Sequence, residues 1–218
     1  MIDQTFFHSP DARLMCLTHD HSVLSHFDQA KLLVENGGRL IQVRTKVKYP
    51  ARFTREAIEI VKLARSFNAK VIINDYADVA THASAWGVHL GTRDENIADV
   101  RKKFGNRLII GRTVHSSADA QKCKIEKPDY IGIGPFRRSS TKGDLIPQLS
   151  REQFKQIIAF LSPLPTFLIG GLSGNDFPLI DDLNLTGLAV CSALWEGNDR
   201  KEQIRKIINS SKPSLLVS

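Results

Sequence analysis

Polar and apolar residues alternate in the segment Ile41-Gln42-Val43-Arg44-Thr45-Lys46. In a β-strand this alternation places Gln42, Arg44 and Lys46 on one face. Arginine offers a flat, two-pronged donor to phosphate oxygens, and lysine offers a compact positive charge. We therefore interpret this segment as a strand end that grips an anion. The alternative is a strand end that is merely solvated.

Carboxylates follow two further apolar runs. Asn74 and Asp75 come directly after Ile72-Ile73, and Asp94 lies four residues after Gly87–Leu90. Two carboxylates combined with phosphate oxygens suit Mg²⁺, because this ion keeps waters and borrows ligands from its substrate. We expect Asp75 and Asp94 to share one Mg²⁺. The plainer interpretations are a turn or helix N-cap at Asn74-Asp75 and a helix cap at Asp94.

His115 and Ser116 follow another apolar run. His115 could act as an acid–base group, but a structural histidine bonded to a backbone carbonyl is the favoured interpretation. Ser116 suits a hydrogen bond to a ligand, and it could equally start the next helix.

The strongest local signal is the segment from Gly132 to Gly143. It contains three cationic residues, Arg137, Arg138 and Lys142. It also contains the hydroxyls of Ser139, Ser140 and Thr141. A loop with this composition is typical of a lid that grips a phosphate. A merely solvated loop would explain the charges but not the clustered hydroxyls.

Two further segments suit a phosphate bound by backbone amides. Gly170-Gly171 and Cys191-Ser192 each end an apolar run. Glycine lets an anion approach backbone N–H groups closely, and the last two loops of a β/α barrel form its usual phosphate site. The sequence thus predicts two phosphate sites, one cationic and bridged by metal, the other built largely from backbone.

Eight apolar, β-branched runs alternate with eight helical patterns. The strand candidates are Leu14–Thr18, Leu40–Arg44, Lys70–Asn74, Gly87–Leu90, Leu108–Arg112, Tyr130–Gly134, Thr166–Gly170 and Gly187–Ser192. The helical patterns are Phe27–Glu35, Arg55–Phe67, Ala77–Ala83, Ile97–Phe104, Ala118–Lys122, Arg151–Phe160, Asn175–Asp181 and Arg200–Asn209. Eight such units favour a closed (β/α)8 TIM barrel over a doubly wound sheet.

We therefore expect one α/β domain over residues 1–218. A short N-terminal extension of about residues 1–12 and a tail of about 211–218 flank the barrel. In such a barrel the chemistry sits just after the C-terminal ends of the strands, where every segment described above falls.

Composition narrows the class of protein. The chain has 218 residues, 42% hydrophobic and 24% charged, with a formal net charge of +7. No membrane span or signal peptide is apparent, and the three cysteines, Cys16, Cys123 and Cys191, suit reduced thiols in the cytoplasm. No basic stripe indicates nucleic acid or a membrane surface. Small phosphorylated substrates are the favoured partners, and a homo-oligomer is compatible with the sequence.

In order along the chain, these segments resemble the thiamine-phosphate synthase family. The family patterns Q-x-R-x-K, N-D, G-V-H-L-G-Q-x-D, H-S, G-x-G-P-x-x-x-T-x-T-K, G-G and V-S are matched here, except that Thr92 replaces glutamine, Ser139 stands in the first threonine position and Cys191 replaces a small aliphatic residue. They fall on Gln42 to Lys46, Asn74-Asp75, Gly87 to Asp94, His115-Ser116, Gly132 to Lys142, Gly170-Gly171 and Cys191-Ser192. Several ordered motifs are far more specific than any one alone.

The resemblance implies a transferase and assigns roles. The enzyme would join a pyrimidine diphosphate to a thiazole phosphate by a dissociative, Mg²⁺-assisted reaction. Asp75 and Asp94 would hold the metal. The pyrimidine diphosphate would be held by Gln42, Arg44, Lys46, Asn74, Ser116 and Lys142, among which Arg44, Ser116 and Lys142 would be catalytic. The thiazole phosphate would be held by Ser139, Ser140, Thr141, Gly171, Cys191 and Ser192.

The chain departs from the family pattern at a few positions. Tyr76 stands where the family usually has arginine, and Thr92 replaces glutamine. Arg93, Arg137 and Arg138 add positive charge near the same end of the barrel. None of these changes removes an implied ligand.

Two rival functions remain open. A thiazole tautomerase with the same barrel resembles this chain, but it uses a histidine where this sequence has Pro135. The other rival is a barrel that binds a thiazole or thiamine phosphate without catalysis.

Overall fold

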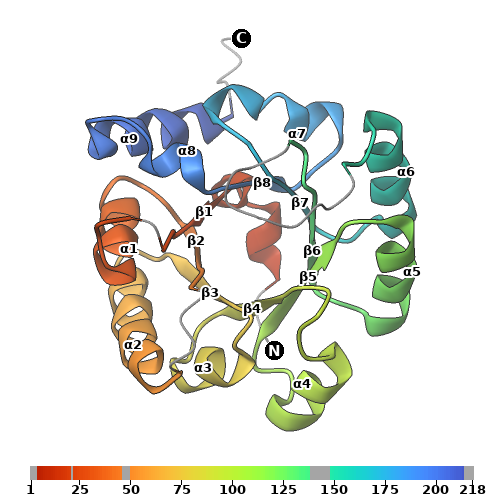
Figure 1. The fold of residues 1–218 in the computed structure, drawn as a ribbon, viewed down its shortest axis with the longest axis horizontal. Coiled ribbons are helices and arrows are strands. Elements are labelled where there is room, and N and C mark those ends of the chain that lie inside the picture. Colours follow the sequence, from red (N-terminus) through yellow and green to blue (C-terminus); the bar gives the residue numbers. More distant parts are fainter. Residues whose placement is uncertain (1–3, 21, 46–49, 138–147, 214–218) are drawn as a thin grey trace.

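Eight parallel strands close into a barrel in chain order, and β8 pairs back with β1 (Figure 1). The computed structural model describes residues 4–20, 22–45, 50–137 and 148–213, without the side chains of residues 50 and 51. The strands are β1 (Leu14–Leu17), β2 (Leu40–Val43), β3 (Lys70–Asn74), β4 (Gly87–Leu90), β5 (Ile109–Val114), β6 (Tyr130–Ile133), β7 (Thr166–Ile169) and β8 (Gly187–Val190). The predicted TIM barrel is confirmed.

The two faces of each strand bury side chains in different places. Met15 and Tyr130 point inward and belong to a cluster that fills the barrel, whereas Cys16 and Ile131 point outward and pack beneath the helices. Gly111 on β5 gives Tyr130 its space, because a Cβ there would lie 2.0 Å from the ring. Both faces are apolar because both are covered, as parallel sheets require.

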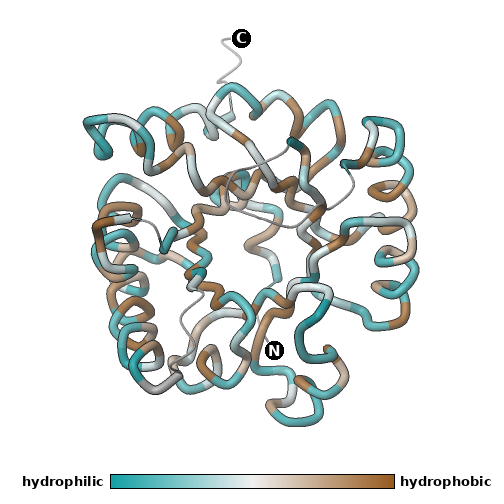
Figure 2. Tube along the Cα trace, viewed as in Figure 1, coloured by the Kyte–Doolittle hydropathy of each residue, from teal (hydrophilic) through white to brown (hydrophobic). Residues whose placement is uncertain are grey.

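The helices surround the barrel, and hydrophobic residues recur along them among hydrophilic ones (Figure 2). They are α1 (His26–Glu35), α2 (Pro50–Ser66), α3 (Ala77–His82), α4 (Ile97–Phe104), α5 (Ser117–Glu126), α6 (Arg151–Leu161), α7 (Leu179–Asp182), α8 (Ser192–Trp195) and α9 (Arg200–Ser211). Ser25, Ser116 and Ser150 start α1, α5 and α6, and each accepts a hydrogen bond from a backbone amide three residues on. No described helix is long and apolar enough to span a membrane.

Helix boundaries differ from expectation where proline intervenes. The pattern Asn175–Asp181 is wrong as a single helix, because Pro178 lacks the N–H that a continuous helix would use. A 3₁₀ helix, η3 (Gly174–Asp176), and the short α7 take its place. The eighth strand ends at Val190, so Ser192 starts α8 instead of ending the strand.

Two 3₁₀ helices, η1 (Thr5–His8) and η2 (Pro10–Arg13), precede β1 and close the end of the barrel at which the strands begin (Figure 1, red). Phe7 is buried, and its ring centroid lies 5.1, 5.6 and 6.1 Å from those of Trp86, Tyr130 and Phe167. Aromatic rings therefore fill this end of the barrel.

Candidate active site

The residues at the end of β2 differ in depth. Gln42 is buried inside the barrel, where its amide nitrogen lies 3.4 Å from the sulfur of Met15 and the side chain also bonds the Tyr130 hydroxyl. Arg44 follows the strand and is half-buried. Burial raises the pKa of the Cys191 thiol to about 11, and the charge of Arg44 partly counters this rise. Arg44 therefore lies near the end of β8. Lys46 lies outside the described residues.

A hydrogen-bonded group of three interior side chains adjoins Gln42 through the Tyr130 hydroxyl. His89 Nδ1 lies 2.9 Å from the Tyr130 hydroxyl, and His89 Nε2 lies 2.9 Å from Thr113 Oγ1. All three side chains are buried. His89 had no assigned role in the sequence, although alternation on β4 does put it on the inner face, opposite to Val88 and Leu90.

The two predicted metal ligands, Asp75 and Asp94, lie at the mouth of the barrel, and both influence the Tyr76 hydroxyl. Asp75 follows β3 with a φ of +67°, a left-handed conformation uncommon outside glycine. Its backbone amide donates to the carbonyl oxygen of His89 at 2.8 Å, which joins the ends of β3 and β4. Burial, and after it the carboxylates of Asp75 and Asp94, raise the pKa of Tyr76. Both carboxylates thus lie within electrostatic range of one hydroxyl.

Neither carboxylate caps a helix, so both cap interpretations are wrong. Asn96 is the N-cap of α4, and its side chain accepts from the amide of Ala98 at 2.9 Å. The N-cap of α3 is Tyr76, which makes no such bond. Asp94 Oδ2 instead accepts from the amide of Gly91 at 2.5 Å, within its own loop.

The donor set fits a hard divalent cation that takes part of its shell from other molecules. Within the described ranges, no three His, Cys, Asp or Glu side chains form a complete metal site. An ion held by Asp75 and Asp94 would need oxygens from water or a substrate, and Mg²⁺ is commonly bound in this way beside phosphates. Magnesium remains a prediction.

The structure distinguishes the two roles considered for His115 and for Ser116. The Nδ1 atom of His115 makes a short hydrogen bond to the carbonyl oxygen of Gly134, so the structural interpretation is confirmed. Ser116 is the N-cap of α5, and its hydroxyl donates to Asp119 Oδ2 at 2.9 Å. A ligand would compete with Asp119 for that hydroxyl, and the predicted ligand contact stays a prediction.

Arg137 joins the loops that follow β6 and β7. Its guanidinium donates to both carboxylate oxygens of Asp176 at 2.7 and 3.0 Å and to the carbonyl of Gly171 at 3.0 Å. Asp176 was not predicted from the sequence, where it reads only as an ordinary residue in a helical pattern. Ser139, Ser140, Thr141 and Lys142 lie outside the described residues.

The two glycines after β7 have positive φ angles, which glycine adopts without a steric clash. Gly170 and Gly171 have φ of +106° and +60°. A Cβ on Gly170 would lie 2.7 Å from the Cα of Pro135, so the two loops approach closely. Cys191 and Ser192 lie at the start of α8, on the neighbouring strand end.

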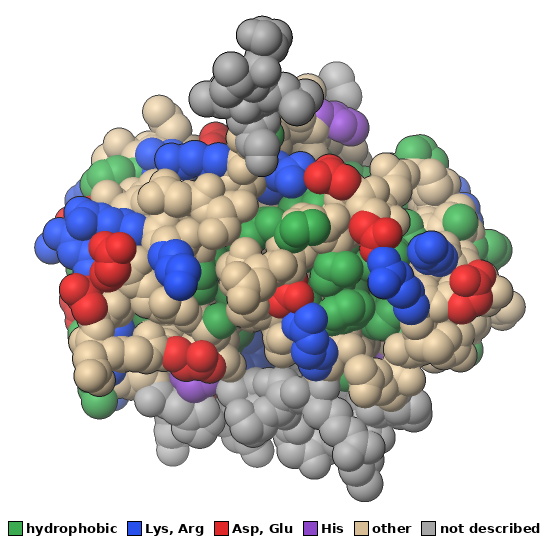
Figure 3. Space-filling model, turned by 90° about the horizontal axis from the view of Figure 1, so that it is seen from above, with side chains coloured by type: hydrophobic (Ala, Val, Ile, Leu, Met, Phe, Trp, Pro, Cys, Tyr) green, Lys and Arg blue, Asp and Glu red, His purple; other side chains and the backbone are tan. Residues whose placement is uncertain are grey.

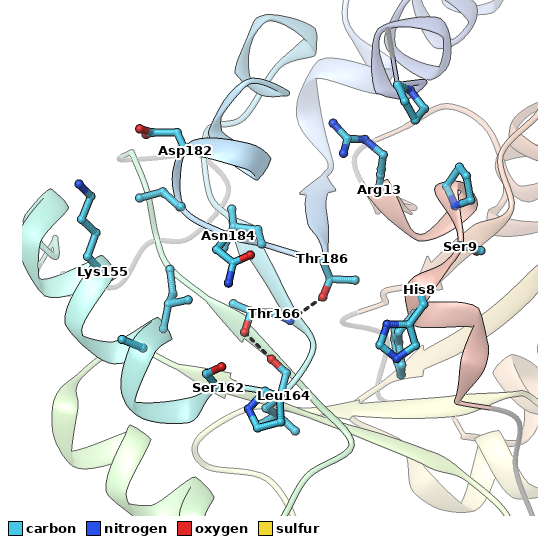
Figure 4. A pocket seen from close by; sticks show the side chains of 18 residues that line it. His8, Ser9, Arg13, Lys155, Ser162, Leu164, Thr166, Asp182, Asn184 and Thr186 are labelled. Atoms are coloured by element: carbon cyan, nitrogen blue, oxygen red, sulfur yellow. Dashed lines mark hydrogen bonds between the residues drawn. The ribbon is translucent and has the colours of Figure 1, made fainter. Parts of the chain in front are cut away.

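A hollow of about 830 Å³ lies at the opposite end of the barrel (Figure 4). Thr166 and Thr186, at the starts of β7 and β8, line it with Arg13, Lys155 and Asp182. We assign no chemistry to this hollow, because in TIM barrels reactions occur where the strands end.

Charges are mixed on the side of the barrel that Figure 3 shows. Cationic and anionic side chains are interspersed there around a small apolar area. The net charge of +7 is therefore not displayed on this face as a basic stripe of the kind that nucleic acids require.

Comparison with known proteins identifies the family. A family model described as thiamine monophosphate synthase matches residues 14–194. A thiamine-phosphate synthase of Phocaeicola vulgatus is 34% identical over 200 residues, which cover 90% of this chain and 96% of that protein. One of Bacteroides fragilis is 31% identical over 200 residues, covering 90% and 98%. The chain belongs to the thiamine monophosphate synthase family. Enzymes of this family are transferases, and so is this protein.

Structural comparison agrees on the fold of this synthase family member. The thiamine phosphate pyrophosphorylase of Pyrococcus furiosus superposes with a TM-score of 0.81, covering 93% of this chain and 96% of that one. At 22% identity this structural similarity supports the barrel fold alone.

The departures from the family pattern have structural explanations at two positions. Tyr76 packs edge-on against Phe53 of α2, with ring centroids 5.9 Å apart. Arg137 adds no free charge at the mouth, because Asp176 pairs with it. In this family member, Tyr76 therefore contacts helix α2, and Arg137 joins two loops.

Proposed function

We propose that this transferase condenses 4-amino-2-methyl-5-(diphosphooxymethyl)pyrimidine with 4-methyl-5-(2-phosphooxyethyl)thiazole, or its carboxylated form. The products are thiamine phosphate and diphosphate. The observation that carries the proposal is that Asp75, Asp94 and Arg44 follow β3, β4 and β2 at the same end of the barrel. Membership of the family supports the same reaction.

The pyrimidine diphosphate is assigned to the β2–β5 side of the mouth. Gln42 on β2 and Asn74 on β3 are inward amides on adjacent strands. Gln42 pairs with Ile72, two residues before Asn74. Amides of this kind can meet the donors and acceptors of an aminopyrimidine. Arg44, Lys46, Lys142 and Ser116 are assigned to the diphosphate.

Magnesium belongs to this proposal. Asp75 and Asp94 would hold the ion, which when bound neutralises negative charge on the diphosphate oxygens. The left-handed conformation of Asp75 supports this role, since strained backbone of this kind gathers at functional sites.

The thiazole phosphate is assigned to the β6–β8 side. Gly171, Cys191 and Ser192 would offer backbone N–H groups, and Ser139, Ser140 and Thr141 would offer hydroxyls. The positive φ of Gly171 supports the assignment, because the missing Cβ leaves backbone accessible to an anion.

The proposed chemistry needs no protein base. The C–O bond between the pyrimidine methylene and diphosphate breaks first, and the bonding electrons leave with the diphosphate. The thiazole nitrogen then donates its lone pair to the methylene cation. Arg44 and Lys142 stabilise the leaving group, while the two sites align the nucleophile. The engagement of His115 by the Gly134 carbonyl is consistent with a reaction without a base.

The three free cysteines support the predicted cytoplasmic location. Burial raises the pKa of Cys16 to about 12, so this thiol is protonated and unreactive at neutral pH.

The direct test combines the purified protein with both phosphorylated halves and Mg²⁺, followed by mass analysis for thiamine phosphate. We expect product with Mg²⁺ and none with excess chelator. Binding of both halves without product would favour the non-catalytic barrel. Conversion of a thiazole phosphate tautomer alone would favour the tautomerase. Asp94→Asn serves as the negative control, because it keeps the size of the side chain and removes its charge.

A further inference from the structure

Arg112 is an arginine in a place where a hydrophobic residue would be expected. It lies on β5, its side chain is only 3% exposed, and it points outward into the layer between the barrel and the helices. Its strand neighbours on that face, Ile110 and Val114, are fully buried and apolar. Burying a guanidinium costs free energy unless its donors are satisfied, so the contacts of this side chain require an explanation.

One side of the guanidinium is paired with Glu126, the last residue of α5. Arg112 Nη2 donates to Glu126 Oε1 at 3.1 Å. Arg112 Nε lies 3.0 Å from Oε2, an ion-pair contact outside hydrogen-bond geometry. The Glu126 side chain is 5% exposed, so both charges are buried together. This pair fixes the guanidinium in place.

The other side of the guanidinium holds the loop between β4 and α4. Arg112 Nη1 donates to the carbonyl oxygen of Gly91 at 3.0 Å and to that of Glu95 at 3.3 Å. These two carbonyls flank Asp94 in the chain. A single nitrogen therefore ties together the two ends of the segment that carries a predicted metal ligand.

The clamp continues from Gly91 to the carboxylate itself. The Gly91 amide donates to Asp94 Oδ2 at 2.5 Å, and the Asp94 amide donates back to the Gly91 carbonyl at 3.2 Å. The Gly91 carbonyl is thus shared by Arg112 and Asp94. A shift of Gly91 would move the donor that orients the Asp94 carboxylate.

From this geometry we infer that Arg112 is a positioning residue that holds Asp94 in place for the divalent cation. The inference rests on the metal role proposed above for Asp94. Arg112 itself touches neither metal nor substrate, since it lies on the outer face of β5. Groups that orient a metal ligand are expected to change metal affinity about 10- to 100-fold when removed.

Arg112→Lys is the test variant, because lysine keeps one positive charge beside Glu126 but lacks the fork that spans two carbonyls. The matched control is Arg101→Lys. Arg101 lies on α4, pairs with Asp129 at 3.1 Å and donates to the Lys127 carbonyl at 3.4 Å, without contacting residues 91–96. Both variants thus lose an ion-paired arginine that also binds a carbonyl.

The readout is Mn²⁺ binding, measured by electron paramagnetic resonance in the presence of inorganic diphosphate. We expect the Kd for Mn²⁺ to rise about tenfold or more in Arg112→Lys and to stay within about twofold of the parent in Arg101→Lys. In turnover, the Mg²⁺ concentration for half-maximal rate should rise in parallel. The kcat at saturating Mg²⁺ should stay within a few-fold of the parent, a split that general destabilisation would not produce.

The variant Asp94→Asn distinguishes failure of this inference from failure of the proposed metal site on which it rests. If Asp94→Asn loses Mn²⁺ while Arg112→Lys binds it like the parent, the positioning role is overturned and the metal site stands. Equal losses in Arg112→Lys and Arg101→Lys would also overturn it, because the effect would then be loss of packing. If Asp94→Asn binds Mn²⁺ like the parent, the metal role and the inference both fall.

A second variant protects the test against misfolding. Should Arg112→Lys not fold, the double variant Arg112→Met/Glu126→Met removes both buried charges together and fills a similar volume, which proteins often tolerate. It loses the clamp completely, so the same rise in the Kd for Mn²⁺ is expected. A Kd unchanged from the parent would overturn the inference.

Discussion

On the β2–β4 side of the barrel mouth the predicted ligand-binding groups are mostly charged side chains, whereas on the β6–β8 side those that the structure describes are glycines and the start of a helix. Each side is held by one arginine. Arg112 is 3% exposed and lies beneath the β4–α4 loop, while Arg137 is 49% exposed and joins the loops after β6 and β7. The same residue type thus fixes a loop from below on one side and from the solvent side on the other.

The difference matches what each side is proposed to bind. Charged side chains need a fixed orientation to neutralise a leaving group, and a buried clamp is little affected by solvent or salt. A site made of backbone amides is already fixed by the fold, so its loops need only a moderate restraint. We therefore expect changes on the β2–β4 side to affect catalysis most, and changes on the β6–β8 side to affect binding and stability.

The largest effect is expected from Asp75→Asn. Asparagine tolerates the positive φ at this position, so the substitution removes the charge with little backbone strain. Mg²⁺-dependent turnover should fall by about a thousandfold, because the ion loses one of two protein ligands. Steady-state rates across a range of Mg²⁺ concentrations provide the measurement.

Asp78→Asn is the matched control for Asp75→Asn. Asp78 is exposed in the first turn of α3, and its charge also acts on Tyr76. Its turnover should stay within about twofold of the parent, since it lies four residues beyond the end of β3. Full activity of Asp75→Asn would contradict a metal-ligand role for Asp75. Equal losses in both variants would indicate that turnover depends on negative charge in this region in general and not on a metal ligand at Asp75.

An intermediate effect is expected from Gly171→Asn on the other side of the mouth. Asparagine accepts a left-handed backbone, so the main change is a side chain in the space that the thiazole phosphate needs. Affinity for the thiazole phosphate should fall about tenfold or more, while the pyrimidine diphosphate should bind as before. Calorimetric titration of each ligand alone measures both.

Gly197→Asn is the control for the glycine conformation. Gly197 lies between α8 and α9, also has a positive φ of +87°, and a Cβ there would meet nothing within 4 Å. It should bind both ligands like the parent. Equal weakening of both ligands by Gly171→Asn would show that the two phosphates share one pocket.

The barrel and the inward or outward direction of its strand residues follow from sequence periodicity. Period-two alternation gives the direction of Gln42 correctly, and the apolar runs give all eight strands. The clamps cannot be predicted in this way. Arg112 and Glu126 are fourteen positions apart and Arg137 and Asp176 thirty-nine, so only the packing of a helix on its own strand and of neighbouring strands side by side brings them together. Alternation places Arg112 on the covered face, but it does not reveal the partners that make this placement stable.

Asp176→Asn should have the smallest effect, and its pH dependence would sharpen the contrast between the two clamps. The Asp176 carboxylate accepts hydrogen bonds from Arg137 and from the amide and hydroxyl of Ser173. Burial by itself would raise the pKa of Asp176, but these bonds outweigh it and lower the pKa below its ordinary value. A carboxylate with a lowered pKa stabilises the fold above the ordinary pKa, and that contribution is lost as pH falls through the folded-state pKa. At pH 7 the variant should therefore melt below the parent, by about 2–4 °C if the half-exposed pair contributes about 1 kcal/mol. The difference should start to shrink below about pH 4, where the carboxylate of the unfolded parent becomes protonated, and it should disappear as pH falls through the lower folded-state pKa. Thermal melts of both proteins from pH 3 to pH 7 would measure it, and a difference that stays constant across this range would show that Asp176 acts through packing and not through its charge.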